Sequence, residues 1–319
     1  MRKVLITMQV PGPVVEELKK DFEIDYNDSL DFLSKEDLIR RAKDASALLV
    51  PLSEKIDKEI IEACDNLEII ANFGAGFDNI DIKAAADKNI VVTNAPAKFS
   101  TQSTAEIAIG LIIDVMRGIT RGEDSLRAGK FKGWKPTYGL GPSVAGKTLG
   151  VFGMGRIGQA VCKRAKALEM DVIYHSRTRL DSDKEKELGA TYVSFDDLVE
   201  KSDVISLNSS YSKDLHHLFD ADVFGRMKDT AYLVNTSRGP IIDEEALVKA
   251  LAENTIAGAG MDVYEFEPAV TEGLLKLDNV VLSPHLGNAT IEAREEMGMI
   301  AAKNIILVLG GKEPINKVN

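Results

Sequence analysis

The chain has few of the residues that mark several classes of protein. Only two of its 319 residues are cysteines, Cys64 and Cys162, and they stand far apart without the spacing of metal ligands. This pattern excludes a disulfide framework and predicts no metal site, and we expect both thiols to be buried. No apolar run approaches the roughly 18 residues that cross a bilayer, and residues 4–6 are too short for a signal-peptide core. The sequence therefore predicts a cytoplasmic protein.

Positive charge is also in deficit. Lysine and arginine total 39 against 50 aspartate and glutamate residues, which gives a net charge of −11. Such a surface repels phosphate backbones and anionic lipids, so we expect neither a nucleic-acid nor a membrane partner. A hydrophobic fraction of 45% and a charged fraction of 28% are typical of a globular protein, and the length suits two domains.

Short β-branched runs alternate with longer amphipathic stretches along the chain, which is the pattern of an α/β fold with parallel sheets. The runs fall into two blocks, and each block predicts a doubly wound, Rossmann-like domain. The first block has predicted strands at residues 4–6, 22–24, 48–50, 69–71 and 90–92. The second block has six predicted strands, at residues 148–153, 172–174, 204–207, 232–234, 260–262 and 280–282.

Two apolar helices are predicted outside these blocks, at residues 103–116 and 291–309. The second helix could pack back on the first block. We therefore predict one domain from residues 1–99 and 288–319, with a second domain, residues 100–287, inserted into it. Residues 121–144 are rich in glycine, carry the only tryptophan and are expected to leave the sheet.

The sequence GMGRIG at residues 153–158 follows a predicted strand and precedes a helical stretch. In that setting Gly153 permits a tight turn, Gly155 lets a pyrophosphate approach the backbone, and Gly158 allows close packing of helix on strand. The phosphate would lie at the helix N-terminus, where free N–H groups favour anions. The motif predicts dinucleotide binding by residues 100–287; a glycine-rich turn without a ligand is the alternative.

The cofactor's ribose is expected at the end of the second strand of this domain. A fold that prefers NAD usually has a carboxylate there, whereas this chain has Ser176, Arg177, Thr178 and Arg179. Guanidinium and hydroxyl groups would accept a 2′-phosphate, so the sequence favours NADP, with NAD possible. An exposed basic loop without this role is the alternative. His175 is expected near the adenosine end.

Three residues with catalytic potential follow predicted strands. Arg238 comes just after residues 232–234, Glu267 follows the strand ending near Val263, and His285 follows residues 280–282. Ligands of an open parallel sheet bind at the carboxyl ends of its strands, so we expect these side chains to converge.

These motifs together resemble the D-2-hydroxyacid dehydrogenase family over nearly the whole chain. The matching segments are FGAGFDNID (residues 73–81), GMGRIG (153–158), NTSRG (235–239), DVYEFEP (262–268) and SPHLGNAT (283–290). Residues 176–179 with Trp134 are most similar to the glyoxylate and hydroxypyruvate reductases within the family. The resemblance implies that residues 1–99 and 288–319 form a flavodoxin-like substrate domain.

The resemblance makes His285 the acid/base, Glu267 its partner and Arg238 the anchor of the substrate. These roles suit the reduction of a 2-keto acid, because hydride addition develops negative charge on the keto oxygen. A carboxylate beside histidine favours its protonated form and holds its ring. The substrate-binding positions implied are Leu52, Phe73, Ala75, Gly76, Trp134 and Arg238, with Trp134 reaching a partner subunit's site.

The positions predicted to contact the cofactor are Thr104, Gly153, Gly155, Arg156, Ile157, Gly158, Ser176, Arg177, Thr178, Asn208, Ser209, Ser210, Thr236, Ser237, Asp262, His285 and Gly287. Asp262 is expected at the nicotinamide amide. Many family members have Pro-Leu-Thr where this chain has Ser210-Tyr211-Ser212, and cofactor affinity or preference is the property that this departure leaves open.

The resemblance predicts a homodimer acting on a small 2-keto or 2-hydroxy acid. Another D-2-hydroxyacid dehydrogenase, acting on gluconate, glycerate or a longer side chain, is the enzymatic alternative. A nucleotide-sensing binding protein is the alternative from another class, but Arg238, Glu267 and His285 favour an enzyme. His216 and His217 lack further ligands, and we interpret both as structural.

Overall fold

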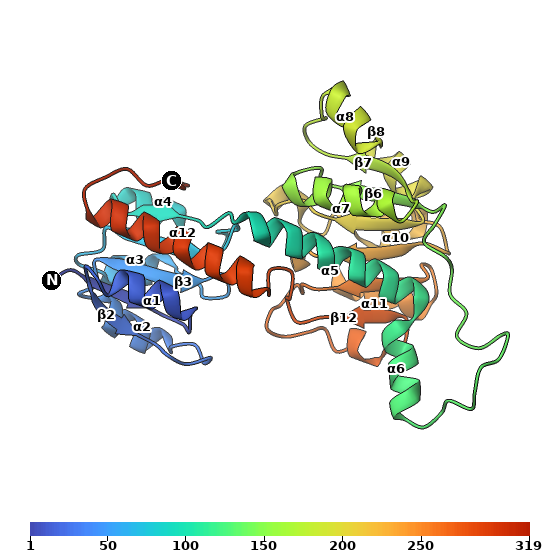
Figure 1. Cartoon of the computed structure of the whole chain (residues 1–319), viewed down its shortest axis with the longest axis horizontal. Coiled ribbons are helices and arrows are strands. Elements are labelled where there is room, and N and C mark those ends of the chain that lie inside the picture. The colour runs from blue at the N-terminus through green and yellow to red at the C-terminus, as the bar shows by residue number, and fades with distance from the viewer. The chain divides into compact units, whose positions relative to one another are not determined.

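The computed structural model describes all 319 residues, and the contacts among them divide the chain into two compact units. Unit 1 consists of Met1–Ser100 and Asn288–Asn319, and unit 2 is Thr101–Gly287. Each unit contains one parallel β-sheet with helices on both faces (Figure 1). The predicted fold class, α/β with two doubly wound Rossmann-like sheets, is confirmed.

Unit 1 has five strands in the order β2-β1-β3-β4-β5, which places its topological switch point between β1 and β3. The strands are β1 (Lys3–Ile6), β2 (Glu23–Tyr26), β3 (Ala47–Pro51), β4 (Ile69–Phe73) and β5 (Val91–Thr93). The helices are α1 (Gly12–Leu18), α2 (Lys35–Ala42), α3 (Lys58–Ala63), α4 (Ile82–Asp87) and α12 (Ile291–Leu309).

Helices α1 and α12 cover one face of this sheet, and α2, α3 and α4 cover the other. The predicted helix at residues 291–309 matches α12. Its first turn is capped by Thr290, whose side chain accepts a hydrogen bond from Ala293 N. Gly298 lets α12 approach the sheet, because a Cβ there would lie 2.4 Å from Val14 Cγ2 and 3.0 Å from Phe73 Cε2.

Unit 2 has seven strands in the order β12-β11-β10-β9-β6-β7-β8. The strands are β6 (Thr148–Phe152), β7 (Asp171–His175), β8 (Ala190–Tyr192), β9 (Val204–Leu207), β10 (Tyr232–Asn235), β11 (Gly258–Met261) and β12 (Val280–Leu282). Six strands were predicted, and the prediction missed β8. This edge strand has only three residues, too few to show an apolar period in the sequence.

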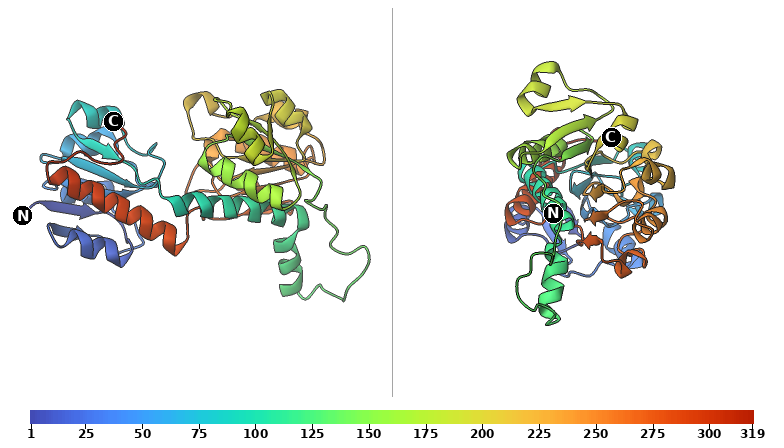
Figure 2. Two further views of the ribbon diagram at one scale, coloured as in Figure 1. Left: turned by 45° about the horizontal axis from the view of Figure 1, so that its top comes forward. Right: turned by 90° about the vertical axis from the view of Figure 1, so that its right-hand side faces the viewer.

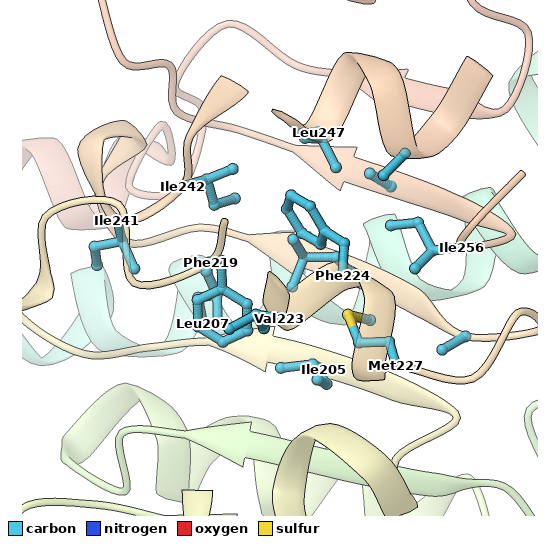
Figure 3. Close-up of a cluster of buried hydrophobic side chains, with 14 of the residues drawn as sticks. Ile205, Leu207, Phe219, Val223, Phe224, Met227, Ile241, Ile242, Leu247 and Ile256 are labelled. Atoms are coloured by element: carbon cyan, nitrogen blue, oxygen red, sulfur yellow. The ribbon is translucent and has the colours of Figure 1, made fainter. Parts of the chain in front are cut away.

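The helices of unit 2 follow the same two-faced arrangement. They are α5 (Lys98–Arg117, which begins at the end of unit 1's first segment), α6 (Ile119–Arg127), α7 (Arg156–Ala167), α8 (Ser182–Leu188), α9 (Phe195–Lys201), α10 (Ala221–Arg226) and α11 (Glu244–Ala252), with short 3-10 helices at Lys213–Leu215, Gly239–Ile241 and Leu274–Lys276. Residues of α5, α7 and α8 pack on one face of the sheet, and residues of α9, α10 and α11 pack on the other. Figure 3 shows the second face, with Phe224 of α10 pointing toward Leu247 of α11.

The segment after α5 leaves the sheet of unit 2, as the glycine content of residues 121–144 predicted. Helix α6 and the loop that follows it run away from the seven strands (Figures 1 and 2). Its large apolar side chains are exposed, including Leu126 at 60%, Trp134 at 83% and Leu140 at 72%.

Both cysteines are buried, as predicted. Burial raises the pKa of each thiol, Cys64 and Cys162, to about 11, so both stay protonated at neutral pH. No helix of the chain combines the length and the apolar character that crossing a bilayer requires.

Candidate active site

The glycine loop between β6 and α7 has the geometry that binding a pyrophosphate requires. Gly153 has φ +93°, and a Cβ there would lie 2.6 Å from Ser209 N. A Cβ on Gly158 would lie 2.1 Å from Gly153 O, whereas Gly155 faces open space. Because Gly155 is also the N-cap of α7 and offers no side chain, the first N–H groups of this helix are available to an anion.

The loop after β9 lies against this turn and carries three predicted cofactor residues, Asn208, Ser209 and Ser210. Asn208 is held by its backbone N–H, which donates to Phe152 O at 2.8 Å, and by its side-chain amide, which donates to Ser206 O at 3.0 Å. Its Oδ1 is buried and has no hydrogen-bond donor. Thr236 Oγ1, just after β10, is likewise buried without a hydrogen-bond partner. Two orphaned polar atoms among the predicted cofactor contacts fit a polar ligand at this edge of the sheet.

The loop after β7 differs in one respect from the sequence-based interpretation. Arg179 forms two hydrogen bonds with Glu185, at 2.8 and 2.9 Å, and its guanidinium lies over the Tyr192 ring. The hydrogen bonds from Arg179 and Tyr174 lower the pKa of Glu185 to about 2. Arg179 is therefore engaged by side chains of α8 and β8. Ser176 is half-buried, and Arg177 and Thr178 are exposed.

His175 lies at the end of β7 among aromatic side chains. Its ring stacks on Phe152 with a centroid distance of 6.2 Å, and its Nδ1 is 3.0 Å from Val193 O. These contacts hold the ring at the carboxyl end of β7, next to β6, the strand that Gly153 follows.

His285 and Glu267 form the central pair of the candidate active site. His285 Nδ1 lies 2.9 Å from Glu267 Oε2, and Glu267 Oε1 accepts a hydrogen bond from Tyr264 N at 3.0 Å. Burial raises the pKa of Glu267, but the hydrogen bond and charge of His285, the Tyr264 N–H and the charge of Arg238 outweigh it. The pKa of Glu267 is therefore lowered. An ionised Glu267 accepts a hydrogen bond from the Nδ1–H of His285, so Nε2 is the ring nitrogen that Glu267 does not engage.

The backbone of His285 is held by Asp262. His285 has φ +54°, and its N–H donates to Asp262 O at 2.8 Å. The Asp262 carboxylate accepts from Ser283 Oγ at 2.5 Å, Leu286 N at 2.7 Å and Gly287 N at 2.8 Å. Burial raises the pKa of Asp262 despite these hydrogen bonds. The sequence motif placed Asp262 at the cofactor but gave no sign that it also fixes the His285 loop.

Predicted cofactor residues from distant segments meet at this loop. A Cβ on Gly287 would lie 3.2 Å from Asp262 Oδ2 and 3.4 Å from Thr104 Oγ1. Thr104 of α5, Asp262 and Gly287 are thus neighbours.

Arg238 lies in a turn that packs on the segment carrying Glu267. Asn235 shapes this turn, because its Oδ1 accepts from Ser237 N and its Nδ2 donates to Arg238 O at 3.0 Å. A Cβ on Gly239 would lie 1.9 Å from Tyr264 C, so only glycine allows the two segments to touch. The positive charge of Arg238 reaches Glu267, whose pKa it lowers.

The remaining predicted substrate residues belong to two different units. Leu52, Phe73, Ala75 and Gly76 belong to unit 1, and Trp134 lies in the exposed loop of unit 2. Leu52 lies against Gly74, where a Cβ would be 2.4 Å from Leu52 Cδ2, and Phe73 is buried beneath α12. Neither Ala75 N nor Gly76 N donates a hydrogen bond within unit 1.

His217 lies within hydrogen-bond distance of a carboxylate beside the candidate site. Its Nε2 lies 2.6 Å from Glu265 Oε1, and its ring stacks on His216 at 4.0 Å. The chain contains no group of three potential ligands of the His, Cys, Asp and Glu types that could hold a metal ion.

The seven-stranded sheet, its glycine loop and the His285–Glu267 pair near Arg238 define an oxidoreductase with an NAD(P)-binding domain. Residues 109–287 match the family model described as D-isomer specific 2-hydroxyacid dehydrogenase, NAD binding domain. A protein of Staphylococcus haemolyticus whose name assigns it to the 2-hydroxyacid dehydrogenases is 49% identical over the full length of both chains. The chain belongs to the D-isomer specific 2-hydroxyacid dehydrogenase family.

Two solved structures are similar over nearly the whole chain. A glyoxylate reductase from Paecilomyes thermophila has a TM-score of 0.88 and 34% identity, covering 99% of this chain and 98% of that one. An NADPH-dependent glyoxylate/hydroxypyruvate reductase from Sinorhizobium meliloti has a TM-score of 0.86 and 34% identity, covering 100% and 98%.

Proposed function

We propose that this protein is an NADP-dependent reductase of small 2-keto acids, with glyoxylate or hydroxypyruvate as substrate. The observation that carries the proposal is the His285–Glu267 hydrogen bond of 2.9 Å near the charge of Arg238. This arrangement suits the delivery of a proton to a carbonyl oxygen that gains negative charge. The two similar reductases support the choice of substrate.

The cofactor would lie along the carboxyl edge of the unit 2 sheet. Gly155 and the N-terminus of α7 would hold its pyrophosphate, while Asn208 Oδ1 and Thr236 Oγ1 offer unused polar atoms. When bound, the reduced nicotinamide supplies a hydride to the keto carbon of the substrate.

The protein's own groups would complete the reduction. Protonated His285 would donate from Nε2 to the keto oxygen, while Arg238 would stabilise the negative charge that develops there. One hydride and one proton convert the 2-keto acid into the 2-hydroxy acid and leave His285 neutral. Glu267 would keep the ring in one orientation through Nδ1. In the oxidative direction, neutral His285 would take the hydroxyl proton.

The substrate carboxylate would be bound by the N–H groups of Ala75 and Gly76. Neither of these groups donates within unit 1, and successive backbone N–H groups form a concave site for an anion. We assign unit 1 to substrate binding and unit 2 to cofactor binding on these grounds.

The preference for NADP rests on Arg177. No carboxylate side chain stands among residues 176–179, and Arg177 is exposed at the end of β7. The adjacent Arg179 is bound to Glu185, so Arg177 would be the main guanidinium for a 2′-phosphate.

The proposed assembly is a homodimer. Leu126, Trp134 and Leu140 expose large apolar surfaces on the segment that leaves the sheet, and such patches mark protein interaction sites. Trp134 would reach the active site of a second copy. Sedimentation should give the mass of a dimer at micromolar concentration, and a monomer there would contradict this assembly.

The experiment is to follow NADPH and NADH absorbance with glyoxylate, hydroxypyruvate, pyruvate and 2-ketogluconate. We expect the fastest oxidation with NADPH and either glyoxylate or hydroxypyruvate. Preference for a larger keto acid would assign a different substrate within the family. Cofactor binding without turnover of any keto acid would contradict the proposal.

A further inference from the structure

The loop after β4 in unit 1 has every carbonyl of residues 74–76 engaged by a different donor. Ala95 N donates to Gly74 O at 2.7 Å. Asn94 Nδ2 donates to Ala75 O at 2.7 Å, and Asn72 Nδ2 donates to Gly76 O at 2.6 Å. The loop is therefore fixed from one side by groups that follow β5 or lie in β4 itself.

Two of these three donors act on the peptide units whose N–H groups would bind the anion, those of Ala75 and Gly76. A trans peptide is planar, so the carbonyl of one residue and the N–H of the next point in opposite directions. The hydrogen bond to Gly74 O thus fixes the N–H of Ala75, and the hydrogen bond to Ala75 O fixes the N–H of Gly76. A bond accepted at the carbonyl also polarises the same peptide and strengthens its N–H as a donor.

Among these donors, Asn94 is the side chain that fixes the peptide carrying the Gly76 N–H, because it donates to Ala75 O. It lies just after β5, is only half-buried, and its backbone N–H donates to Asn316 O at 3.2 Å. Asn72 is fully buried and is held in turn by Asn79, whose Nδ2 donates to Asn72 Oδ1 at 3.2 Å and to Glu54 O at 3.0 Å.

We infer that Asn94 is a positioning residue for substrate binding, which orients the Gly76 N–H toward the substrate carboxylate through its hydrogen bond to Ala75 O. Asn72 supports the neighbouring peptide in the same way. This inference rests on the proposed function, because it assumes that Ala75 and Gly76 bind the carboxylate. It adds residues that touch no substrate atom but set the affinity for the acid.

The test compares Asn94→Ala and Asn94→Asp with Asn27→Ala. Asn27 is a matched control in unit 1, because its Nδ2, like that of Asn94, donates to the backbone: to Thr7 O at 2.9 Å and to Asp31 O at 3.1 Å. Two measurements are made on each variant: the KM and kcat for the best 2-keto acid, and the Kd of oxamate, an unreactive 2-keto acid analogue, with NADPH present.

We expect Asn94→Ala to raise both the KM and the oxamate Kd about tenfold, with kcat changed less than about threefold. Asn94→Asp keeps the size of the side chain but points an acceptor at Ala75 O, so its effect should be at least as large. The Kd of NADPH and the values for Asn27→Ala should match those of the parent protein. A rise in KM that Asn27→Ala shares would indicate loss of structure and overturn the inference.

Two outcomes separate this inference from the proposed function. If the parent protein neither turns over a 2-keto acid nor binds oxamate, the proposed function fails. If it does both and the two Asn94 variants keep its KM and oxamate Kd, the proposed function stands and the role of Asn94 is wrong.

Discussion

His285 and Glu267 are joined by a hydrogen bond of 2.9 Å from Nδ1 to Oε2, and both side chains are about one-third exposed. The carboxylate is fixed on its other oxygen by Tyr264 N, so it can orient the imidazole without moving. The histidine is fixed at its backbone by Asp262. A histidine that is fixed at both its side chain and its backbone can present Nε2 to a single atom of a substrate, as a proton donor must.

Glu267→Gln should lower kcat for the 2-keto acid about 100-fold, because the amide orients His285 without a charge to stabilise its protonated form. The KM and the Kd of NADPH should change little, since Glu267 is not placed against either ligand. Steady-state kinetics check this.

Glu265→Gln is the matched control for that change. Glu265 stands two residues away and pairs with His217 rather than His285. If both variants lost kcat equally, Glu267 would act only by keeping residues 264–267 folded.

Arg177→Gln should lower the preference for NADPH over NADH at least tenfold, because a charge-assisted hydrogen bond to phosphate contributes about 1.5–3 kcal/mol. The ratio of kcat/KM for the two cofactors is the measurement. Arg179→Gln is the control. It removes the ion pair with Glu185 and should lower thermal stability while the cofactor ratio stays near that of the parent. If Arg179→Gln lowered the cofactor ratio and Arg177→Gln did not, Arg179 would have to leave Glu185 to bind the cofactor.

Glu54→Gln should stabilise the protein at neutral pH. Glu54 is 7% exposed, its Oε1 is buried without a donor, and burial raises its pKa despite the hydrogen bond from Thr7. Its carboxyl is neutral in both folded and unfolded states below about pH 4. As the pH rises, the unfolded state ionises first, so the parent protein loses stability by about 1.4 kcal/mol for each unit by which the pKa is raised.

Glu54→Gln cannot ionise at this position, so its free energy of unfolding should not fall in this way as the pH rises. Its Tm should match the parent near pH 4 and exceed it at pH 7.5, as measured by thermal unfolding. The matched control is Glu23→Gln, which removes an exposed carboxylate on β2 and should give no comparable gain in Tm at pH 7.5. A Glu54→Gln Tm below that of the parent at pH 7.5 would show that the ionised carboxylate is stabilising.

Asp262→Asn should impair both stability and catalysis. In place of an acceptor, the amide nitrogen would face either Gly287 N or the pair formed by Leu286 N and the Ser283 hydroxyl. A buried donor left without a partner costs about 1–3 kcal/mol, and the His285 backbone would lose its support. We expect a lower Tm and a fall in kcat of at least tenfold. Unchanged kcat with a lower Tm would contradict the role of Asp262 in positioning His285.

The sequence predicted the elements that carry long apolar patterns or a motif. Helix α12, the two sheets and the glycine loop are of this kind, because burial on both faces leaves apolar runs and a pyrophosphate site needs glycine at fixed spacings. Strand β8 escaped because three residues at a sheet edge carry no period.

The site was predictable as residue types but not as contacts. Arg177 and Arg179 are equivalent in sequence, and only the fold brings Glu185 to one of them. Asn94 follows β5 and Asn72 lies within β4, and nothing in the sequence marks either residue. Their role depends on which carbonyls of residues 74–76 point toward them in the fold.

The central claim is that His285 delivers the proton in an NADPH-dependent reduction of a 2-keto acid. The most direct test is NADPH oxidation by the parent protein and by His285→Gln, each saturated with glyoxylate or hydroxypyruvate. We expect rapid oxidation by the parent and a rate at least about 1,000-fold lower in the variant, with the Kd of NADPH changed little. A variant that oxidises NADPH at the parental rate would contradict the account.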